Sequence, residues 1–254
     1  MNNLFSLQGR TALITGGSRG IGRMIAAGFL TQGARVYISA RKAAACDLTA
    51  QELSTLGHCV SLPADVSSVA GAKALAEAYA AHEPQLDILV NNAGAAWGAP
   101  FDDFPESGWD KVVDLNLKAP FFLTQALAGH LRLAGKQRVA KVINIASIDG
   151  LSVNPQETYS YAASKAGLVH LTRRMALRLI QDNIAVTAIA PGAFASEMNR
   201  DARDRADEVS AHIPAGRIGV DEDMAGAAIY LASRAGDYVV GETLVVDGGV
   251  TLQR

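Results

Sequence analysis

Two residues in the stretch "YSYAASK" have the spacing needed for proton transfer, namely Tyr161 and Lys165. A rise of four residues along a helix returns to the same face, so the two side chains would lie together. An isolated phenol, with a pKa near ~10, is poorly matched to acid–base work at neutral pH. A cation about 6 Å away, at an effective dielectric of about 20, would lower that pKa by ~2 units. Tyr159 has only Ala163 four residues on, so we expect Tyr161 to be the reactive tyrosine and Lys165 to lower its pKa.

Short apolar segments alternate with longer segments of helical period along the chain. The expected strands are Ala12–Thr15, Val36–Ala40, Val60–Pro63, Ile88–Asn91, Val142–Ala146, Ala185–Ile189 and Leu244–Val246. The expected helices are Gly20–Gln32, Ala43–Leu56, Val69–His82, Trp109–Leu133, Tyr159–Gln181 and Asp221–Ser233. Strands that are apolar nearly throughout are typical of a sheet covered on both faces. The pattern therefore predicts one α/β domain over residues 1–254, a Rossmann fold with a doubly wound, seven-stranded parallel sheet and helices on both faces.

Composition excludes several classes of function. The chain has 254 residues, 49% of them apolar, with a net charge of −2 and no clustered basic face of the kind that nucleic acid requires. No secretion signal or apolar run long enough to span a membrane is recognisable, and Cys46 and Cys59 lack metal or redox spacing. The five histidines show no metal-ligand spacing either. We expect a cytoplasmic protein that has no catalytic metal and does not bind nucleic acid or membrane.

A glycine-rich turn, "TGGSRGIG", follows the first expected strand. Glycines allow a tight turn and a close approach of backbone to ligand, and the helix that follows directs its free N–H groups and positive dipole end there. A dinucleotide pyrophosphate fits that position, although such turns also occur for structural reasons. The candidate cofactor contacts in this turn are Gly16, Ser18, Arg19, Gly20, Ile21 and Gly22.

The residues after the second expected strand favour NADPH over NADH. NAD-selective folds of this kind place an acid here on the adenosine ribose, but this chain has Ala40 followed by Arg41. A guanidinium at Arg41, assisted by Arg19, suits a 2′-phosphate, although each alone could be a solvated surface cation. Asp65 and Val66, after the third expected strand, are placed to hold the adenine, or Asp65 caps a helix.

The ordered motifs together resemble the short-chain dehydrogenase/reductase family over essentially the whole chain. They are "TGGSRGIG", "NNAG" ending at Gly94, "NIAS" ending at Ser147, the Tyr161/Lys165 pair and "APG" ending at Gly192. The segments "NNAGAAWG", "GWDKVVDLN" and "PGAFASEM" look most like bacterial 3-oxoacyl-(acyl-carrier-protein) reductases of the rhamnolipid-associated type.

The resemblance implies a catalytic tetrad of Asn116, Ser147, Tyr161 and Lys165. In the family, the tyrosine is the general acid, the serine donates to the substrate oxygen, the lysine binds the nicotinamide ribose, and the asparagine holds a water near the lysine. Further implied cofactor contacts are Asn92, Ala93, Gly94, Pro191, Gly192 and Ser196.

The implied activity is NADPH-dependent reduction of a carbonyl, with a 3-oxoacyl thioester as the expected substrate. The family also implies a substrate loop at about residues 192–215, a homotetramer, and acyl carrier protein as a possible partner. Carrier docking would need a basic patch, and the candidate contributors are Arg132, Lys136, Arg138 and Arg174. Two alternatives stay open: an alcohol or sugar dehydrogenase of the same family, and a non-catalytic dinucleotide sensor or scaffold.

Overall fold

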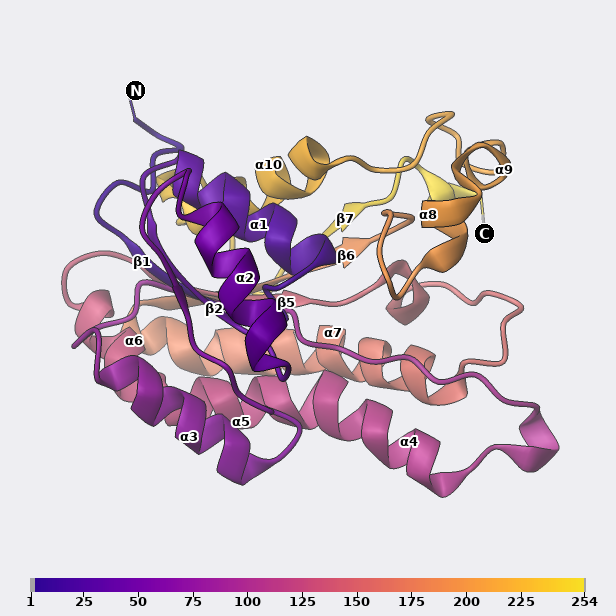
Figure 1. Ribbon diagram of the computed structural model, residues 1–254, viewed down its shortest axis with the longest axis horizontal. Helices are drawn as coiled ribbons and strands as arrows, with labels where there is room; N and C mark the ends of the chain where they lie inside the picture. Colours follow the sequence, from indigo (N-terminus) through magenta and orange to yellow (C-terminus); the bar gives the residue numbers. More distant parts are fainter. Residues whose placement is uncertain (1–2, 254) are drawn as a thin grey trace.

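The computed structural model describes residues 3–253 and contains one seven-stranded parallel sheet between two layers of helices (Figure 1). The strand order is β3-β2-β1-β4-β5-β6-β7, and every neighbouring pair is parallel. The bounds are β1 Thr11–Thr15, β2 Arg35–Ser39, β3 Cys59–Ser61, β4 Ile88–Asn91, β5 Ala140–Ile145, β6 Ile184–Pro191 and β7 Thr243–Val246. The order reverses direction between β1 and β4, which confirms the predicted doubly wound Rossmann fold.

Two large hydrophobic clusters pack the sheet against its helices, one on each face. One lies between the sheet and three helices above it in Figure 1, and the other lies between the sheet and the helices below. The upper helices are α1 Gly20–Thr31, α2 Ala43–Leu53 and α10 Asp221–Ala232. The lower helices are α3 Val69–Ala80, α4 Glu106–Val113, α5 Ala119–Ala126, α6 Ala128–Gly135 and α7 Tyr159–Leu179. Among residues 3–253, none of these helices combines the length and apolar composition needed to cross a bilayer.

The predicted long helix Trp109–Leu133 is wrong as a single element. The structure has α4, a π turn at Asp114–Lys118, then α5 and α6 with a break at Leu127. Pro120 explains the first interruption, because it has no N–H to donate to the carbonyl of Asn116 four residues earlier. π turns often mark functional sites, and this one carries a predicted tetrad residue.

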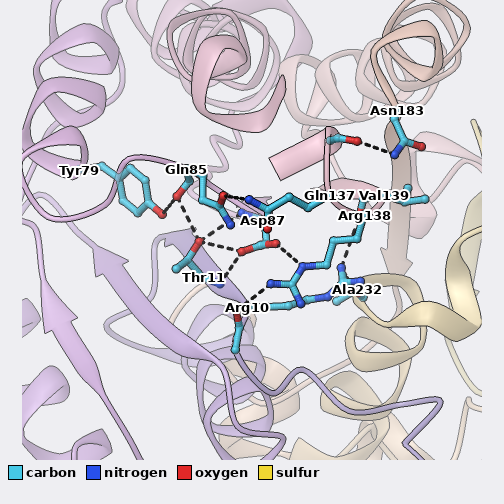
Figure 2. A network of polar contacts seen from close by, with 12 residues as sticks. Arg10, Thr11, Tyr79, Gln85, Asp87, Gln137, Arg138, Val139, Asn183 and Ala232 are labelled. Atoms are coloured by element: carbon cyan, nitrogen blue, oxygen red, sulfur yellow. Dashed lines mark hydrogen bonds and ion pairs between the residues drawn. The ribbon is translucent and has the colours of Figure 1, made fainter. Parts of the chain in front are cut away.

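A buried network of charges fixes the amino edge of the sheet (Figure 2). The Asp87 carboxylate is fully buried and accepts hydrogen bonds from the Thr11 backbone N–H at 3.0 Å and from Arg138 Nε at 2.9 Å. Arg10 is also buried and donates to the carbonyls of Val139 and Ala232. Asp87 thereby joins the starts of β1 and β4 to the segment that leads into β5.

Replacing Asp87 with Asn should lower the free energy of unfolding by about 2–3 kcal/mol, because the Arg138 guanidinium loses its buried counter-charge. Asp182→Asn is the matched control, since its ion pairs with Arg132 and Arg178 lie at the surface and should cost less than about 1 kcal/mol. Urea denaturation measures both. Equal losses for the two variants would contradict the role given to Asp87.

Candidate active site

The predicted tetrad comes together at the carboxyl edge of the sheet, where ligands bind in folds of this type. Ser147 follows the end of β5, and Tyr161 and Lys165 lie on the first turns of α7. Asn116 lies in the π turn, and its side chain reaches the same end of α7 through a hydrogen bond to Ser164 Oγ at 3.1 Å. The chain thus brings residues from three separate segments to one place.

Lys165 is the most deeply buried charged group of the site. Only 5% of its surface is exposed, and Nζ donates to the Ile145 carbonyl at the end of β5 over 2.7 Å. A Cβ added to Gly94 would lie 3.8 Å from Lys165 Nζ and 3.3 Å from Asn116 Oδ1, so the "NNAG" turn borders both groups. Burial penalises the charged form and lowers the Lys165 pKa to about 8.

The expectation that Lys165 lowers the Tyr161 pKa is wrong for this structure. Burial raises the pKa of the Tyr161 phenol to about 12, a hydrogen bond with Ser147 opposes that rise, and the charge of Asp149 adds to it. Lys165 Nζ lies 5.6 Å from the centre of the Tyr161 ring, close to the predicted separation. Desolvation of the phenol is the largest cause of the shift, and Lys165 is not among its causes. Tyr161 therefore holds its proton at neutral pH.

Asn116 has its side chain fully engaged with protein groups. Its Nδ2 donates to the Ala95 carbonyl at 2.9 Å, and its Oδ1 accepts from the Ala95 N–H at 2.8 Å. The expectation that Asn116 holds a water near Lys165 stays a prediction.

Ser164 connects two parts of the site through its hydroxyl. Its Oγ accepts from Asn116 Nδ2 and donates to the Tyr161 carbonyl at 2.8 Å. Ser164 thus fastens the π turn to the helical turn that presents Tyr161. Its position beside the lysine gave no indication of this bond, because the partner is 48 residues away in sequence.

The glycine turn forms the predicted cradle between β1 and α1. Gly16 and Gly20 have φ of +65° and +50°, a region that other residues rarely adopt. A Cβ on Gly22 would lie 2.3 Å from the Gly16 carbonyl oxygen, so only glycine fits there. Asn92 holds the turn in place, because its Nδ2 donates to the carbonyls of Thr15 and Gly16 at 2.8 and 3.1 Å.

Thr15 is a residue of this cradle that sequence reasoning missed. Its Oγ1 accepts from the backbone N–H groups of Asn92 and Ala93, both at 3.0 Å, and so joins the "NNAG" turn to the end of β1. A polar residue at the end of an apolar strand was the available indication. This hydroxyl therefore holds the "NNAG" turn, and Asn92 of that turn in its turn holds the glycine turn.

The end of α1 beside the cradle suits an anion. Arg19 at the N-cap makes no side-chain capping bond to the helix, and within this described helix the first turn carries no acid. The free N–H groups and the positive end of the helix dipole therefore face the turn. Ser18 is fixed there through its carbonyl, which accepts from Thr49 Oγ1 at 2.9 Å. These features fit a dinucleotide pyrophosphate.

The other predicted cofactor contacts divide into exposed and buried groups. Arg41 is exposed at the start of α2. The Asp65 pKa is lowered first by two hydrogen bonds from Ser67, and the positive charge of Arg41 lowers it further. Val66 and Ile21 pack against the two hydrophobic clusters, so they would contact a cofactor mainly through backbone atoms.

On the opposite side of the crevice, the segment after β6 closes against the cradle. Pro191 ends β6 and pairs with Val246, and Gly192 approaches Asp247 so closely that a Cβ would lie 2.8 Å from its Cα. Ser196 lies against Gly20, with 3.2 Å between its Cβ and a Cβ added to Gly20. Its Oγ accepts from the Asn199 N–H at 3.0 Å, which leaves the hydroxyl hydrogen free to donate to a ligand.

The arginines proposed for carrier docking do not gather at the site. Arg138 belongs to the Asp87 network at the amino edge (Figure 2), and Arg132 is paired with Asp182. Lys136 lies between α6 and β5, near the same edge, and Arg174 lies in the middle of α7. The sequence could not place these residues, and the fold sends them away from the carboxyl edge. Within residues 3–253, no group of three or more His, Cys, Asp or Glu side chains has the arrangement of a metal site.

Comparisons with known proteins agree with this geometry. Residues 16–251 match a short-chain dehydrogenase model described as "Enoyl-(Acyl carrier protein) reductase". The chain is 48% identical to the rhamnolipids biosynthesis 3-oxoacyl-(acyl-carrier-protein) reductase of Pseudomonas aeruginosa, over 99% of this chain and all of that one. It is 39% identical to the 2-dehydro-3-deoxy-D-gluconate 5-dehydrogenase of Dickeya dadantii, over 97% of each chain. The solved RhlG/NADP active-site complex of Pseudomonas aeruginosa superimposes with a TM-score of 0.95 at 49% identity, over 99% of this chain and all of that one.

Burial of Lys165 should appear in the pH dependence of stability. Its pKa in the folded protein, about 8, lies below the ordinary lysine value of 10.5. Between these values the unfolded chain binds more protons, so the lysine's contribution to stability rises with pH. Lys165→Met removes this contribution. The stability of the variant relative to the parent should therefore be greatest near pH 7 and decline toward pH 10. A difference independent of pH, in urea denaturation at several pH values, would contradict the burial of a charged lysine.

Proposed function

The chain belongs to the short-chain dehydrogenase/reductase family, and on that basis we propose that it is an NADPH-dependent reductase of a 3-oxoacyl thioester. Tyr161 acts as the general acid. The observation that carries the proposal is the convergence of Ser147, Tyr161 and Lys165 at the carboxyl edge of the sheet, where Tyr161 is hydrogen-bonded to Ser147 and its ring centre lies 5.6 Å from Lys165 Nζ. A tyrosine that holds its proton at neutral pH is ready to give it to an oxygen that gains negative charge.

In the proposed reaction, the substrate carbonyl oxygen lies between the hydroxyls of Ser147 and Tyr161. Ser147 Oγ already accepts from the Asp149 backbone N–H at 3.1 Å, so its own hydrogen is free to stabilise the developing oxyanion. NADPH, when bound, supplies the hydride that reduces the carbonyl carbon. The proton of Tyr161 passes to the carbonyl oxygen, and the product is a secondary alcohol.

Lys165 and Asn116 would restore the proton to Tyr161. The Lys165 ammonium stabilises the phenolate left after proton transfer, although it does not set the resting pKa. With its own pKa lowered to about 8, Lys165 can also release a proton near neutral pH. We assign it a bond to the nicotinamide ribose as well, and we assign Asn116 a water that connects the lysine to solvent.

The glycine cradle, Arg19 and Arg41 support NADPH as the cofactor. We propose that residues 16–22 hold the pyrophosphate, Arg41 and Arg19 hold the 2′-phosphate, and Asp65 and Val66 border the adenine. Ala93, Gly94, Pro191 and Gly192 would surround the nicotinamide end, with Ser196 on its carboxamide. The Pseudomonas aeruginosa structure that the fold matches at a TM-score of 0.95 is an NADP complex, which supports this assignment.

A sugar dehydrogenase of the same family is the second candidate, favoured by the 39% identity to a gluconate-type 5-dehydrogenase. Oxidation of an alcohol needs a base, and a Tyr161 pKa of about 12 opposes formation of the phenolate. Because an enzyme lowers the barrier in both directions equally, the substrate, and not this pKa, distinguishes the two candidates. A non-catalytic sensor would not need four tetrad residues brought together at one edge of the sheet.

We further propose a homotetramer and a cytoplasmic location. A largely apolar groove between the π turn, α5 and α7 would be covered by a second copy. It is lined by Leu117, Lys118, Phe121, Phe122, Gly167, His170, Leu171 and Arg174. The segment at about residues 192–215, which contains the short helices α8 Arg200–Asp204 and α9 Ala206–Ser210, would close over the substrate as part of one Rossmann domain.

Tyr161→Phe should reduce NADPH-dependent reduction of a 3-oxoacyl thioester by at least about 1,000-fold and leave NADPH affinity nearly unchanged, because only the proton donor is removed. Tyr159→Phe is the matched control and should keep most of the activity, since this tyrosine is exposed and its hydroxyl bonds Glu157. Steady-state absorbance assays and fluorescence titration of NADPH measure these effects. Substantial activity in Tyr161→Phe would overturn the assignment.

Arg41→Asp should weaken NADPH binding by about 10-fold or more, because a charge-assisted bond to a phosphate is replaced by repulsion. NADH affinity, which needs no 2′-phosphate partner, serves as the internal control and should change little. Titration of the variant and the parent with NADPH and NADH gives the ratio of the two dissociation constants for each protein. An unchanged preference between them would remove Arg41 from the cofactor site.

A further inference from the structure

Three segments surround the place where Ser147 and Tyr161 meet, and we call them the entrance segments. They are residues 94–106 after β4, residues 147–158 after β5 and residues 192–210 after β6. All three leave the carboxyl edge of the sheet, at the right of Figure 1. The first two are in direct contact, because the Ala99 N–H donates to the Glu157 carbonyl at 3.2 Å. A substrate must pass between these segments to reach Tyr161.

The entrance segments are strongly acidic. They contain ten carboxylates and three arginines, a formal net charge of −7, whereas the whole chain has −2. The acidic residues are Asp102, Asp103, Glu106, Asp149, Glu157, Glu197, Asp201, Asp204, Asp207 and Glu208. The rest of the chain must therefore be positive overall.

Two of the three arginines are already neutralised by carboxylates of the same segment. Arg203 is paired with Glu197 and with Asp204. Arg205 is paired with Asp201 at 2.6 Å and with Glu208 at 3.3 Å. The third arginine, Arg200, lies near enough to Asp204 to act on its charge. These arginines therefore provide little attraction for an anion outside the segment.

Carboxylates also reach the reacting end of the site. Glu157 Oε1 accepts from the Phe101 N–H and from the Tyr159 hydroxyl, both at 3.3 Å. Asp149 follows Ser147 by two residues, and its charge acts on Tyr161 itself. A negatively charged substrate would thus meet like charge along the approach and again beside the proton donor.

Large apolar side chains are exposed between these carboxylates. Val153 is 91% exposed, Phe101 72% and Met198 51%, and each belongs to a different entrance segment. Phe101 and Phe104 pack edge-to-face on Tyr159 with ring centres 5.6 and 5.7 Å apart, so the aromatic surface continues to the start of α7. Such a surface gains free energy by covering an alkyl chain, and not by covering a polyhydroxylated chain.

The cofactor side of the crevice has the opposite charge. Arg19, Arg41 and Lys42 lie beside the glycine cradle, which the acidic segments border through Ser196 against Gly20. The crevice is therefore divided into a basic part for phosphates and an acidic, partly apolar part for substrate. An anionic substrate gains no compensating contact from the basic part when a phosphate-bearing cofactor already occupies it.

We propose that the entrance segments select an uncharged, apolar 3-oxoacyl compound and disfavour the same acyl group on an anionic carrier. The proposal rests on the proposed carbonyl reductase function and narrows its substrate class. The acyl chain is recognised by the exposed apolar side chains, and the carboxylates repel coenzyme A phosphates, an acidic carrier protein and sugar acids. Placement of Arg132 and Arg138 at the amino edge agrees with this, because no carrier-docking patch forms from them.

The test compares two thioesters that share one acyl group: the 3-oxodecanoyl ester of N-acetylcysteamine, which is uncharged, and that of coenzyme A. With saturating NADPH, kcat/KM for the uncharged thioester should be at least about 10-fold higher at 20 mM salt. Raising salt to 500 mM should increase kcat/KM for the coenzyme A thioester about 5-fold or more and change the uncharged one less than about 2-fold, because screening removes the repulsion. A coenzyme A thioester that is preferred at low salt, or whose kcat/KM falls with salt, would overturn the proposal.

Charge-neutralising variants locate the effect. Asp102→Asn/Asp103→Asn should raise low-salt kcat/KM for the coenzyme A thioester about 3-fold and leave the uncharged thioester unchanged. Glu77→Gln/Glu242→Gln removes the same charge near the amino edge and should change neither. Equal effects of the two pairs would contradict a local role. Failure to reduce any 3-oxoacyl thioester, charged or uncharged, would instead refute the proposed function.

Discussion

The ammonium group of Lys165 is buried at the carboxyl edge of the sheet and donates to the last carbonyl of β5. That one bond fixes where α7 begins relative to the sheet, and therefore where Tyr161 stands relative to Ser147. A buried cation is tolerated only with hydrogen-bond partners, and the π turn, Gly94 and Ser164 form the polar wall around it.

Charge is distributed along the crevice in a way that matches the chemistry proposed for each part. The cradle presents helix N–H groups and arginines where phosphates would lie, and the substrate side presents carboxylates and apolar side chains. At the amino edge, the charged groups pair with one another in the network around Asp87 (Figure 2). The residues of the proposed site lie at the opposite, carboxyl edge. Stability and selectivity are thus carried by opposite edges of one sheet.

The fold was predictable because it depends on short-range patterns. Apolar strands, glycine turns and helical periods each leave a local trace, and their alternation determines a parallel sheet. The boundaries of the long helix could not be predicted, since Pro120 acts through a carbonyl four residues earlier. The spacing of Tyr161 and Lys165 predicted their proximity but not that burial would raise the pKa of the phenol, because burial depends on the surrounding packing. The partners of Ser164 and Arg138 are distant in sequence, so no local pattern could reveal them.

The central claim is that Tyr161 is held in its protonated form by burial, which makes it an acid ready for carbonyl reduction. Ultraviolet difference titration of the parent against Tyr161→Phe, in the ligand-free protein, isolates the absorbance of this one phenol. A pKa well above 10, near the value of about 12 expected for the buried group, is the predicted result. A phenolate that forms at or below pH 10 would show that the lysine's charge outweighs burial, and would contradict the account.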